Sequence, residues 1–223
     1  TTDFIQFAEG SCLIECGDTK VLCCASVEDR TPPHVPYGHG WVTAEYSMLP
    51  RANRERSKRD VSKLKLSPRS AEIQRLVGRS LRAAVDMKRL GELTITVDCD
   101  VLQGDGGTRT ASVTGGFVAL ALACRKLVRD GDLASSPIRH YVTGVSAGIV
   151  EDTALLDLRY SEDSRAQVDL NCIMTETGEL IELQGTGEGR SFTITEQQEL
   201  VRLCAKGCKE LQAIQKEALG GGF

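Results

Sequence analysis

The organisation of this chain is decided by residues Leu93 to Ser112, which read LTITVDCDVLQGDGGTRTAS. As far as Val101, apolar and polar residues alternate with the two-residue period of a half-buried β-strand. The glycine-rich turn Gly104–Gly107 then leads toward an apolar run, Phe117–Leu127, which predicts a buried helix. A strand, a glycine loop and a helix N-terminus in this order are arranged to hold an anion.

The residues on the N-terminal side of this stretch predict a sheet and a helix. Turn residues separate three expected strands, which are Ser11–Cys16, Lys20–Val27 and Trp41–Tyr46. Ser67 suits the N-cap of the helix and Pro68 its first position, and apolar residues from Ile73 to Val85 share one face. We expect this helix to continue to Gly91.

The residues after Pro137 repeat this pattern in outline. Four strands are expected, which are Val142–Val150, Ala154–Tyr160, Gln167–Met174 and Glu179–Gln184. A final helix is expected near Thr195, which has Gln198 at the spacing of a capping box. Grouped hairpins and helices favour the α+β class, with one half at residues 1–135 and the other at residues 136–223.

Charge is distributed unevenly along the chain. The 223 residues carry a formal net charge of −4, which by itself argues against a nucleic acid partner. Eleven basic and three acidic residues between Arg51 and Arg82, however, give that block +8, so the rest of the chain carries −12. The block begins with Arg51–Lys65, which lacks apolar periodicity and predicts a loop that is mobile or ordered by a partner. Such a basic block predicts an anionic partner or an acidic neighbouring subunit.

The composition predicts an intracellular protein, which we place in the cytoplasm without a membrane partner. Thr1–Gly10 lacks the basic and apolar runs of a signal peptide, and no stretch reaches the ~18 uncharged apolar residues of a membrane span. Nine cysteines without a C-x-x-C pair favour buried reduced thiols over disulfides or a zinc cage. With three histidines in all, a histidine-rich metal site is not expected.

The glycine loop is the first candidate for chemistry. Gly107 allows a ligand to approach the backbone closely, while the hydroxyls of Thr108 and Ser112 can donate to phosphate oxygens and Arg109 can add a charged fork. The loop is not a Walker phosphate-binding loop, because G-x-x-x-x-G-K-[ST] is absent. The alternative interpretation is a glycine turn with a structural arginine.

Two groups of arginines are candidates for binding anions. Arg69 is placed in the first turn of its helix, where the macrodipole disfavours a cation unless an anion binds there. A salt bridge from Arg69 to Glu72 is the alternative. Arg75, Arg79 and Arg82 form a separate cationic face, which is either a binding surface or a solvated helix surface.

Two carboxylates are candidates for a metal site. Asp169 and Asn171 point to one side of a predicted strand, because the apolar residues between and beside them take the other side. Asp163 lies a short distance upstream. Two hard oxygen ligands near a phosphate site suit Mg²⁺ or Mn²⁺. The alternative is that both are ordinary turn and strand-surface aspartates.

Several motifs together resemble the ribonuclease PH family of bacteria, in order along nearly the whole chain. They are GWVTAEYSMLPR at 40–51, EIQRLVGR at 72–79, DCDVLQ at 98–103, DGGTRTAS at 105–112, EDS at 162–164 and DLN at 169–171. Ring subunits of the exosome and polynucleotide phosphorylase share a looser form of this pattern.

The resemblance implies a fold and an activity. The fold would be the α+β ribonuclease PH fold, which is like domain 2 of ribosomal protein S5, with mixed sheets and packed helices. The activity would be that of a phosphorolytic 3′→5′ exoribonuclease, a tRNA nucleotidyltransferase. It would trim tRNA precursors and other RNA 3′ ends with inorganic phosphate and release nucleoside diphosphates. The assembly would be a homo-oligomeric ring of six, a trimer of dimers.

The resemblance also implies residue roles. The phosphate would be bound by Arg69, Gly107, Thr108, Arg109 and Ser112. Asp163 and Asp169 would be catalytic and would hold a divalent metal, which we expect to be Mg²⁺. RNA binding or ring contacts would come from Arg51, Arg56, Arg59, Arg75 and Arg79.

Two other functions fit parts of the same pattern. A catalytically inactive, exosome-like RNA-binding ring subunit would lack one or more of Arg69, Arg109, Asp163 and Asp169, all of which are present here. A small-molecule phosphate-binding protein would have no use for the basic block.

Overall fold

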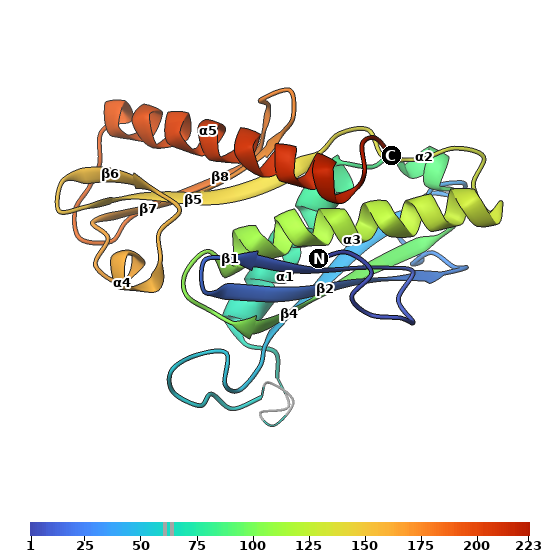
Figure 1. The fold of residues 1–223 in the computed structure, drawn as a ribbon, viewed down its shortest axis with the longest axis horizontal. Helices are drawn as coiled ribbons and strands as arrows, with labels where there is room; N and C mark the ends of the chain where they lie inside the picture. The colour runs from blue at the N-terminus through green and yellow to red at the C-terminus, as the bar shows by residue number, and fades with distance from the viewer. Residues whose placement is uncertain (60–61, 63–64) are drawn as a thin grey trace.

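The fold of this protein is α+β, with two mixed layers of sheet and helix (Figure 1). A computed structural model describes residues 1–59, 62 and 65–223, so Asp60 and Lys63 of the basic block lie outside the described residues. The first half contains β1 (Gly10–Cys16), β2 (Thr19–Glu28), β3 (Trp41–Met48), α1 (Pro68–Ala83), α2 (Met87–Leu90), β4 (Thr94–Gln103) and α3 (Thr108–Asp130). The second contains β5 (Val142–Val150), β6 (Thr153–Leu156), α4 (Tyr160–Asp163), β7 (Val168–Thr175), β8 (Leu180–Gly187) and α5 (Ile194–Ala218).

The first sheet has the strand order β1-β2-β4-β3. β1 and β2 form the hairpin that the Gly17-Asp18 turn predicts, and β4 pairs with β2 in antiparallel and with β3 in parallel orientation. The alternating apolar residues of β4, including Ile95, Val97 and Cys99, are buried against α1 and α3. The end of β4 therefore delivers the chain to the glycine loop and to the start of α3.

The second sheet has the order β6-β5-β7-β8 and is antiparallel throughout. α5 covers one of its faces with Leu200, Cys204 and Cys208, and α3 lies between this layer and the first sheet (Figure 1). Buried residues from both halves, such as Phe117 of α3 and Val142 of β5, belong to one apolar cluster. The two halves are therefore packed together by a shared core.

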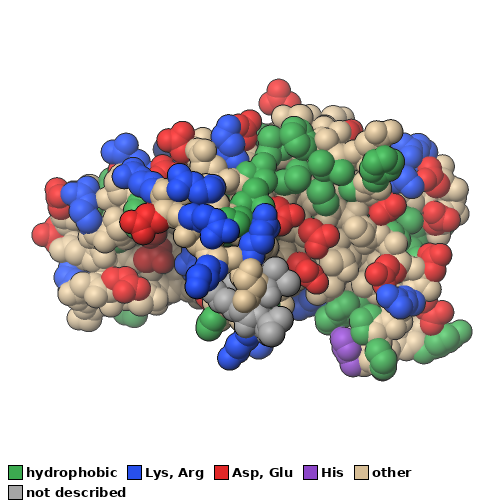
Figure 2. Space-filling view, turned by 90° about the horizontal axis from the view of Figure 1, so that it is seen from below, with side chains coloured by type: hydrophobic (Ala, Val, Ile, Leu, Met, Phe, Trp, Pro, Cys, Tyr) green, Lys and Arg blue, Asp and Glu red, His purple; other side chains and the backbone are tan. Residues whose placement is uncertain are grey.

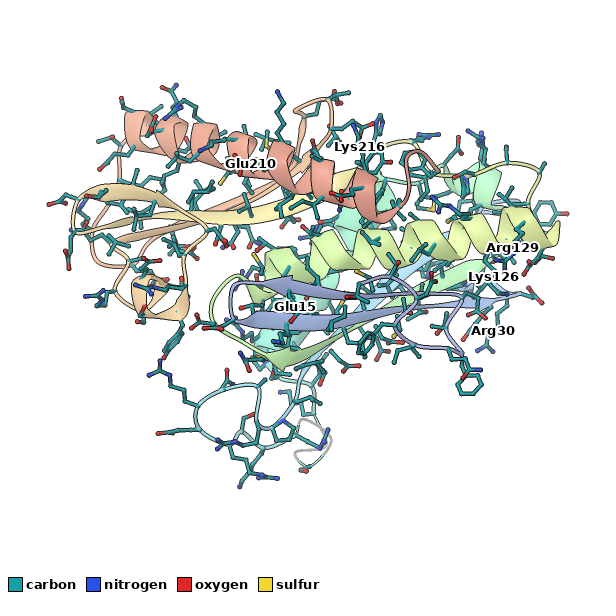
Figure 3. The ribbon with its side chains drawn as sticks, in the orientation of Figure 1. Glu15, Arg30, Lys126, Arg129, Glu210 and Lys216 are labelled. Atoms are coloured by element: carbon teal, nitrogen blue, oxygen red, sulfur yellow. The ribbon has the colours of Figure 1, made fainter. Side chains whose placement is uncertain are left out.

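α3 is the most buried helix of the fold. Among the described residues it is the one helix long and apolar enough to cross a membrane, and 78% of that segment is buried inside the protein, as in a core helix. Its C-terminus carries Lys126 and Arg129 (Figure 3), where cations interact favourably with the helix dipole, and it ends at Gly131, whose φ is 90°.

Two predicted helix boundaries in the first half were wrong. The helix predicted to reach Gly91 ends at Ala83, because the Asp86 carboxylate caps a separate helix, α2, by accepting hydrogen bonds from the N–H groups of Lys88 and Arg89. α3 begins at Thr108, well before the apolar run at Phe117, because its first turns bury small and polar side chains against both sheets. Hydrophobic periodicity cannot detect such turns.

Two boundaries in the second half also differ. The strand predicted over Ala154–Tyr160 ends at Leu156, and Tyr160 begins α4. The last helix is capped by Thr193 rather than near Thr195: the Thr193 hydroxyl accepts from the N–H of Glu196, and the Glu196 carboxylate accepts from the N–H of Thr193 at 2.7 Å. The capping box therefore uses Glu196 and not Gln198.

All nine cysteines are free thiols. Seven are buried, and burial raises the pKa of Cys12 to about 11 and that of Cys124 to about 12. Because the thiolate is the reactive form of cysteine, these side chains act as small apolar groups of the core.

We expect the close contact between β1 and α3 to be sensitive to a single methyl group. A Cβ at Gly10 would lie 2.1 Å from the carbonyl oxygen of Ala119, so Gly10→Ala should lower the free energy of unfolding by ~1–3 kcal/mol. Urea denaturation measures this. The matched control is Gly189→Ala, whose new Cβ would meet nothing nearer than 3.5 Å. Equal stability of the two variants would contradict the packing described here.

Candidate functional site

A polar cavity of about 580 Å³ lies between the start of α3 and the second sheet. It brings together six residues that the sequence singles out, which are Arg69, Gly107, Thr108, Arg109, Asp163 and Asp169. They come from α1, the α3 N-terminus, α4 and β7, so the cavity exists only in the folded chain. Its lining thus combines arginines with carboxylates, side chains of the kinds that bind anions and cations.

The N-terminus of α3 supplies the anion-binding wall of the cavity. The N-cap Gly107 has a left-handed backbone with φ 58°, and no side chain of the described residues caps this end of the helix. The preceding Gly106 also has a positive φ, and a Cβ there would lie 2.2 Å from the carbonyl oxygen of Leu158. The first N–H groups of a helix have no partner within the helix, so this turn is built to donate to an anion.

Thr108 is held at this wall by a residue that sequence reasoning did not assign to the site. The Tyr46 hydroxyl lies 2.8 Å from the Thr108 Oγ1 and is buried. Burial raises the pKa of Tyr46, while the hydrogen bond with Thr108 and the nearby charge of Arg69 act against that rise. The only sequence signal for Tyr46 was its place in the segment at 40–51.

Arg69 and Arg109 both line the cavity. Arg69 follows Pro68 in the first turn of α1, a turn without an acidic residue. Glu72, the alternative partner of Arg69, is instead paired with Arg109, whose Nη1 lies 3.2 Å from the Glu72 Oε1. The same Nη1 donates to the Gln184 Oε1 at 3.1 Å. The Arg109 side chain is 19% exposed, so its charge acts in a partly desolvated place.

Ser112 is the one predicted phosphate-binding residue that is not brought to the cavity. Its Oγ donates to the carbonyl oxygen of Thr108 at 2.8 Å, and the residue is fully buried within α3. The helical spacing that places Ser112 one turn after Thr108 therefore commits its hydroxyl to the helix backbone.

Asp163, Asp169 and Glu188 line the same cavity as the two arginines. The Asn171 Nδ2 donates to the Asp169 Oδ2 at 3.1 Å, as expected for two side chains on one face of β7. Burial raises the pKa of Asp169, and the like charge of Asp163 raises it further, whereas Arg109 and Asn171 act in the opposite direction. A carboxylate whose charge is disfavoured by burial and by a neighbouring carboxylate is suited to bind a cation.

The donor set fits a hard divalent cation such as Mg²⁺. Asp163 and Asp169 offer carboxylate oxygens to the same cavity, and a cation between them would offset their repulsion. In the described part of the chain, no group of three or more His, Cys, Asp or Glu side chains could enclose an ion. Mg²⁺ usually keeps several waters and takes only one or two carboxylates beside phosphate oxygens, so a two-carboxylate site matches its preference.

Ser146 was also missed by sequence reasoning. Its Oγ is buried without a hydrogen-bond partner among the described residues, on β5 opposite Asn171, and the residue lines the cavity. A serine in an apolar strand carries no sequence signal for function.

The remaining basic residues divide into anchored and exposed groups. The Arg79 guanidinium forms a forked ion pair with Glu182 of β8, at 2.7 Å from the Oε1. Arg82 lies over the Trp41 ring, 4.4 Å from its centroid, and donates to the carbonyl oxygen of Val42. Both arginines are thus held by contacts within the protein, although the Arg79 side chain remains 46% exposed. Arg75 is exposed as well.

Arg51, Arg56 and Arg59 are exposed on the segment that follows β3. The face of the molecule to which this segment belongs gathers many Lys and Arg side chains, with Asp and Glu beside them (Figure 2). These three arginines are therefore available to an external partner.

The family was identified by comparison with known proteins. Residues 1–126 match the model of the 3′ exoribonuclease family, domain 1, and residues 140–218 match that of domain 2. The structure is also similar to rice (Oryza sativa) Rrp46, with a TM-score of 0.79 and 14% identity over 98% of this chain and 92% of that one.

Two archaeal structures are similar as well. An archaeal exosome core has a TM-score of 0.77 and 22% identity, covering 96% of this chain and 84% of that one. An Archaeoglobus fulgidus exosome with RNA bound to the active site has a TM-score of 0.77 and 22% identity, covering 95% and 85%. Together with the two family models, which span most of the sequence, these similarities establish that the chain has the ribonuclease PH fold and belongs to the 3′ exoribonuclease family.

Proposed function

We propose that this protein is a phosphorolytic 3′→5′ exoribonuclease of the bacterial ribonuclease PH type. It trims the 3′ ends of tRNA precursors and other RNAs with inorganic phosphate and releases nucleoside diphosphates. The proposal rests on one observation: Arg69, the N-terminus of α3 with Arg109, and the pair Asp163 and Asp169 line a single cavity. In the proposed site an anion would bind next to a cation, which supports the transfer of a nucleotidyl group from RNA to phosphate.

The proposed reaction needs positioning more than a strong base. A phosphate oxygen attacks the phosphorus of the terminal phosphodiester, a new P–O bond forms, and the bond to the preceding nucleotide's O3′ breaks. The proton carried by the phosphate passes to that oxygen, so a nucleoside diphosphate and a shortened RNA with a free 3′-hydroxyl result. Arg69, Arg109 and the N–H groups at Gly107 would orient the attacking phosphate, and positioning of this kind lowers the barrier by holding both reactants in line.

The carboxylates would act on the other side of the reacting phosphorus. Asp163 and Asp169 would hold a divalent cation, which we take to be Mg²⁺, or act at the leaving O3′ directly. A bound cation supplies neutralisation of the charge that develops on the phosphoryl oxygens. The raised pKa of Asp169 reflects first its burial and then the like charge of Asp163.

The exposed basic segment is the surface that we assign to contacts with RNA and with a neighbouring subunit. Arg51, Arg56 and Arg59 would contact RNA or a neighbouring subunit, and we propose a homo-oligomeric ring of six, a trimer of dimers, in the cytoplasm. Arg75 could share this role, whereas Arg79 and Arg82 are already held by Glu182 and Trp41.

An inactive RNA-binding ring subunit is the alternative. It is favoured by the similarity to Rrp46 and to an archaeal exosome core. It is opposed by the cavity itself, which keeps both arginines and both aspartates. RNA binding without phosphate-dependent shortening would support it.

Phosphate dependence is the first expected property. With Mg²⁺ and a 3′-extended tRNA, the protein should shorten the RNA when phosphate is present and release nucleoside diphosphates. Denaturing gels and chromatography of the released nucleotides measure this. Shortening at the same rate without phosphate, or release of nucleoside monophosphates, would exclude phosphorolysis.

Removal of the Arg109 charge should abolish the activity. Arg109→Ala leaves the phosphate without its charged fork, and we expect a rate at least ~100-fold below that of the parent protein, since one lost transition-state donor has this effect in other enzymes. Phosphate-dependent shortening measures this, with circular dichroism as a check on folding. Arg202→Ala, which removes an exposed arginine paired with Glu199 on α5, is the control that should keep full activity.

Asp169→Asn should remove the activity and yet stabilise the fold at neutral pH. The folded pKa of Asp169 is raised, so its ionised form is less favourable in the folded than in the unfolded chain. This penalty is absent below the unfolded pKa of ~3.9 and grows as pH rises through the folded pKa. Urea denaturation at pH 7 and at pH 4 should therefore show a stabilised variant only at pH 7.

The exposed residue Asp132 offers a matched control for this comparison. Asp132→Asn should change the free energy of unfolding by less than ~0.5 kcal/mol at either pH. An Asp169→Asn variant that is less stable than the parent protein at pH 7 would contradict the electrostatic interpretation of the site.

A further inference from the structure

Five side chains from α1, α3 and β8 form a chain of hydrogen bonds behind the cavity. They are Glu72 and Arg79 of α1, Arg109 of α3, and Glu182 and Gln184 of β8. The chain runs from Glu72 to Arg109, on to Gln184 and Glu182, and returns to α1 at Arg79. It joins the first half of the protein to the second at the arginine that the proposed function uses for phosphate.

Arg109 is held by one corner of its guanidinium. Its Nη1 donates both to the Glu72 Oε1 at 3.2 Å and to the Gln184 Oε1 at 3.1 Å. Within the residues that the structure describes, no protein group accepts from its Nε or Nη2. Arg109 lines the cavity, whereas Glu72 and Gln184 do not. The anchored corner thus faces the protein, and the Nε–Nη2 edge is free to bind two oxygens of one anion, the geometry that guanidinium groups favour.

Gln184 is the one member of this chain that must both accept and donate. A guanidinium only donates and an ionised carboxylate only accepts, so the amide between them has one possible orientation. The Gln184 Oε1 accepts from Arg109, and its Nε2 donates to the Glu182 Oε1 at 3.1 Å. Neither a carboxylate nor a hydrocarbon of the same length could make both bonds.

Glu182 is fixed in turn by Arg79. The Arg79 Nε donates to the Glu182 Oε2 at 3.0 Å and its Nη2 donates to the Oε1 at 2.7 Å, so the carboxylate cannot rotate without losing a forked pair. Its side chain is only 15% exposed, which limits competition from water. Arg79 therefore anchors the support of Arg109 from the other end of the chain.

We propose that Gln184 is a positioning residue for phosphate, which holds Arg109 through Nη1 so that the Nε–Nη2 edge stays aimed at the anion. Glu182 and Arg79 orient the Gln184 amide. The proposal rests on the proposed function for the identity of the anion. Without Gln184, Arg109 would keep a single acceptor, the half-exposed Glu72, and could turn away from the cavity.

The direct test is Gln184→Leu in the full chain. We expect its KM for phosphate to rise about tenfold, equivalent to ~1.4 kcal/mol, with its affinity for a 3′-extended tRNA unchanged. Calorimetric titration with inorganic phosphate should show the same loss without any turnover. The matched control is Gln212→Leu, which removes a buried glutamine that is bonded to Thr143 and should leave the KM for phosphate unchanged.

A double variant tests the order of donors and acceptors along the hydrogen-bond chain. Gln184→Glu keeps an acceptor for Arg109 but sets a second carboxylate against Glu182, so its KM for phosphate should also rise. Adding Glu182→Gln restores a donor between the two positions and should lower that KM again by about threefold or more, a coupling expected only of side chains in contact.

The outcomes separate this inference from the proposed function. If the parent protein consumes phosphate and Gln184→Leu keeps the parent KM and phosphate affinity, the positioning role is wrong. Equal losses of phosphate and RNA affinity in Gln184→Leu and Gln212→Leu would show a general structural effect and also overturn it. If the parent protein does not shorten RNA, the proposed function fails, while phosphate titration of the two variants still decides the role of Gln184.

Discussion

The structure depends on the burial of α3 between two sheets. The first N–H groups of a helix have no partner within the helix and must be satisfied at its N-terminus. α3 begins after Gly107, where no side chain of the described residues caps the helix. Gly106 and Gly107 both have a left-handed backbone, which favours glycine. A side chain at Gly106 would also collide with the carbonyl of Leu158. The same packing that buries the helix therefore leaves an anion-binding turn at the junction of the two halves.

Several charged side chains of the cavity lie where their charges are disfavoured, which is typical of a functional site. Two arginines occupy first turns of helices, where cations are disfavoured, and the partly buried Asp169 lies near the like charge of the exposed Asp163. The surrounding hydrogen bonds hold these groups in place: Tyr46 at Thr108, Asn171 at Asp169, and Glu72 and Gln184 at Arg109. The two large apolar clusters of the protein supply the folding free energy that offsets the cost of this arrangement.

Sequence reasoning identified most residues of the candidate site but few of the residues that hold them in place. Asp169 and Asn171 were placed on one strand face because strands alternate, and Arg69 stood out because a cation in a first helical turn is unfavourable. The partners of Arg79 and Arg82 could not be predicted, since Glu182 and the Trp41 ring are distant in sequence. The start of α3 was placed too late because small and polar residues of its first turns are buried on all sides.

The sequence by itself determined the local elements and the chemical character of the site. Alternation marked β4, glycines marked the turn before α3, and charge counting marked the basic block. Only the tertiary structure decided that Arg109 is anchored through one nitrogen by two halves of the molecule and that Ser112 donates to its own helix. It also decided that Ser146 has no hydrogen-bond partner in the described part of the chain. The reason is physical: periodicity reports which way a side chain points from its own element, whereas hydrogen-bond partners depend on how elements pack against one another.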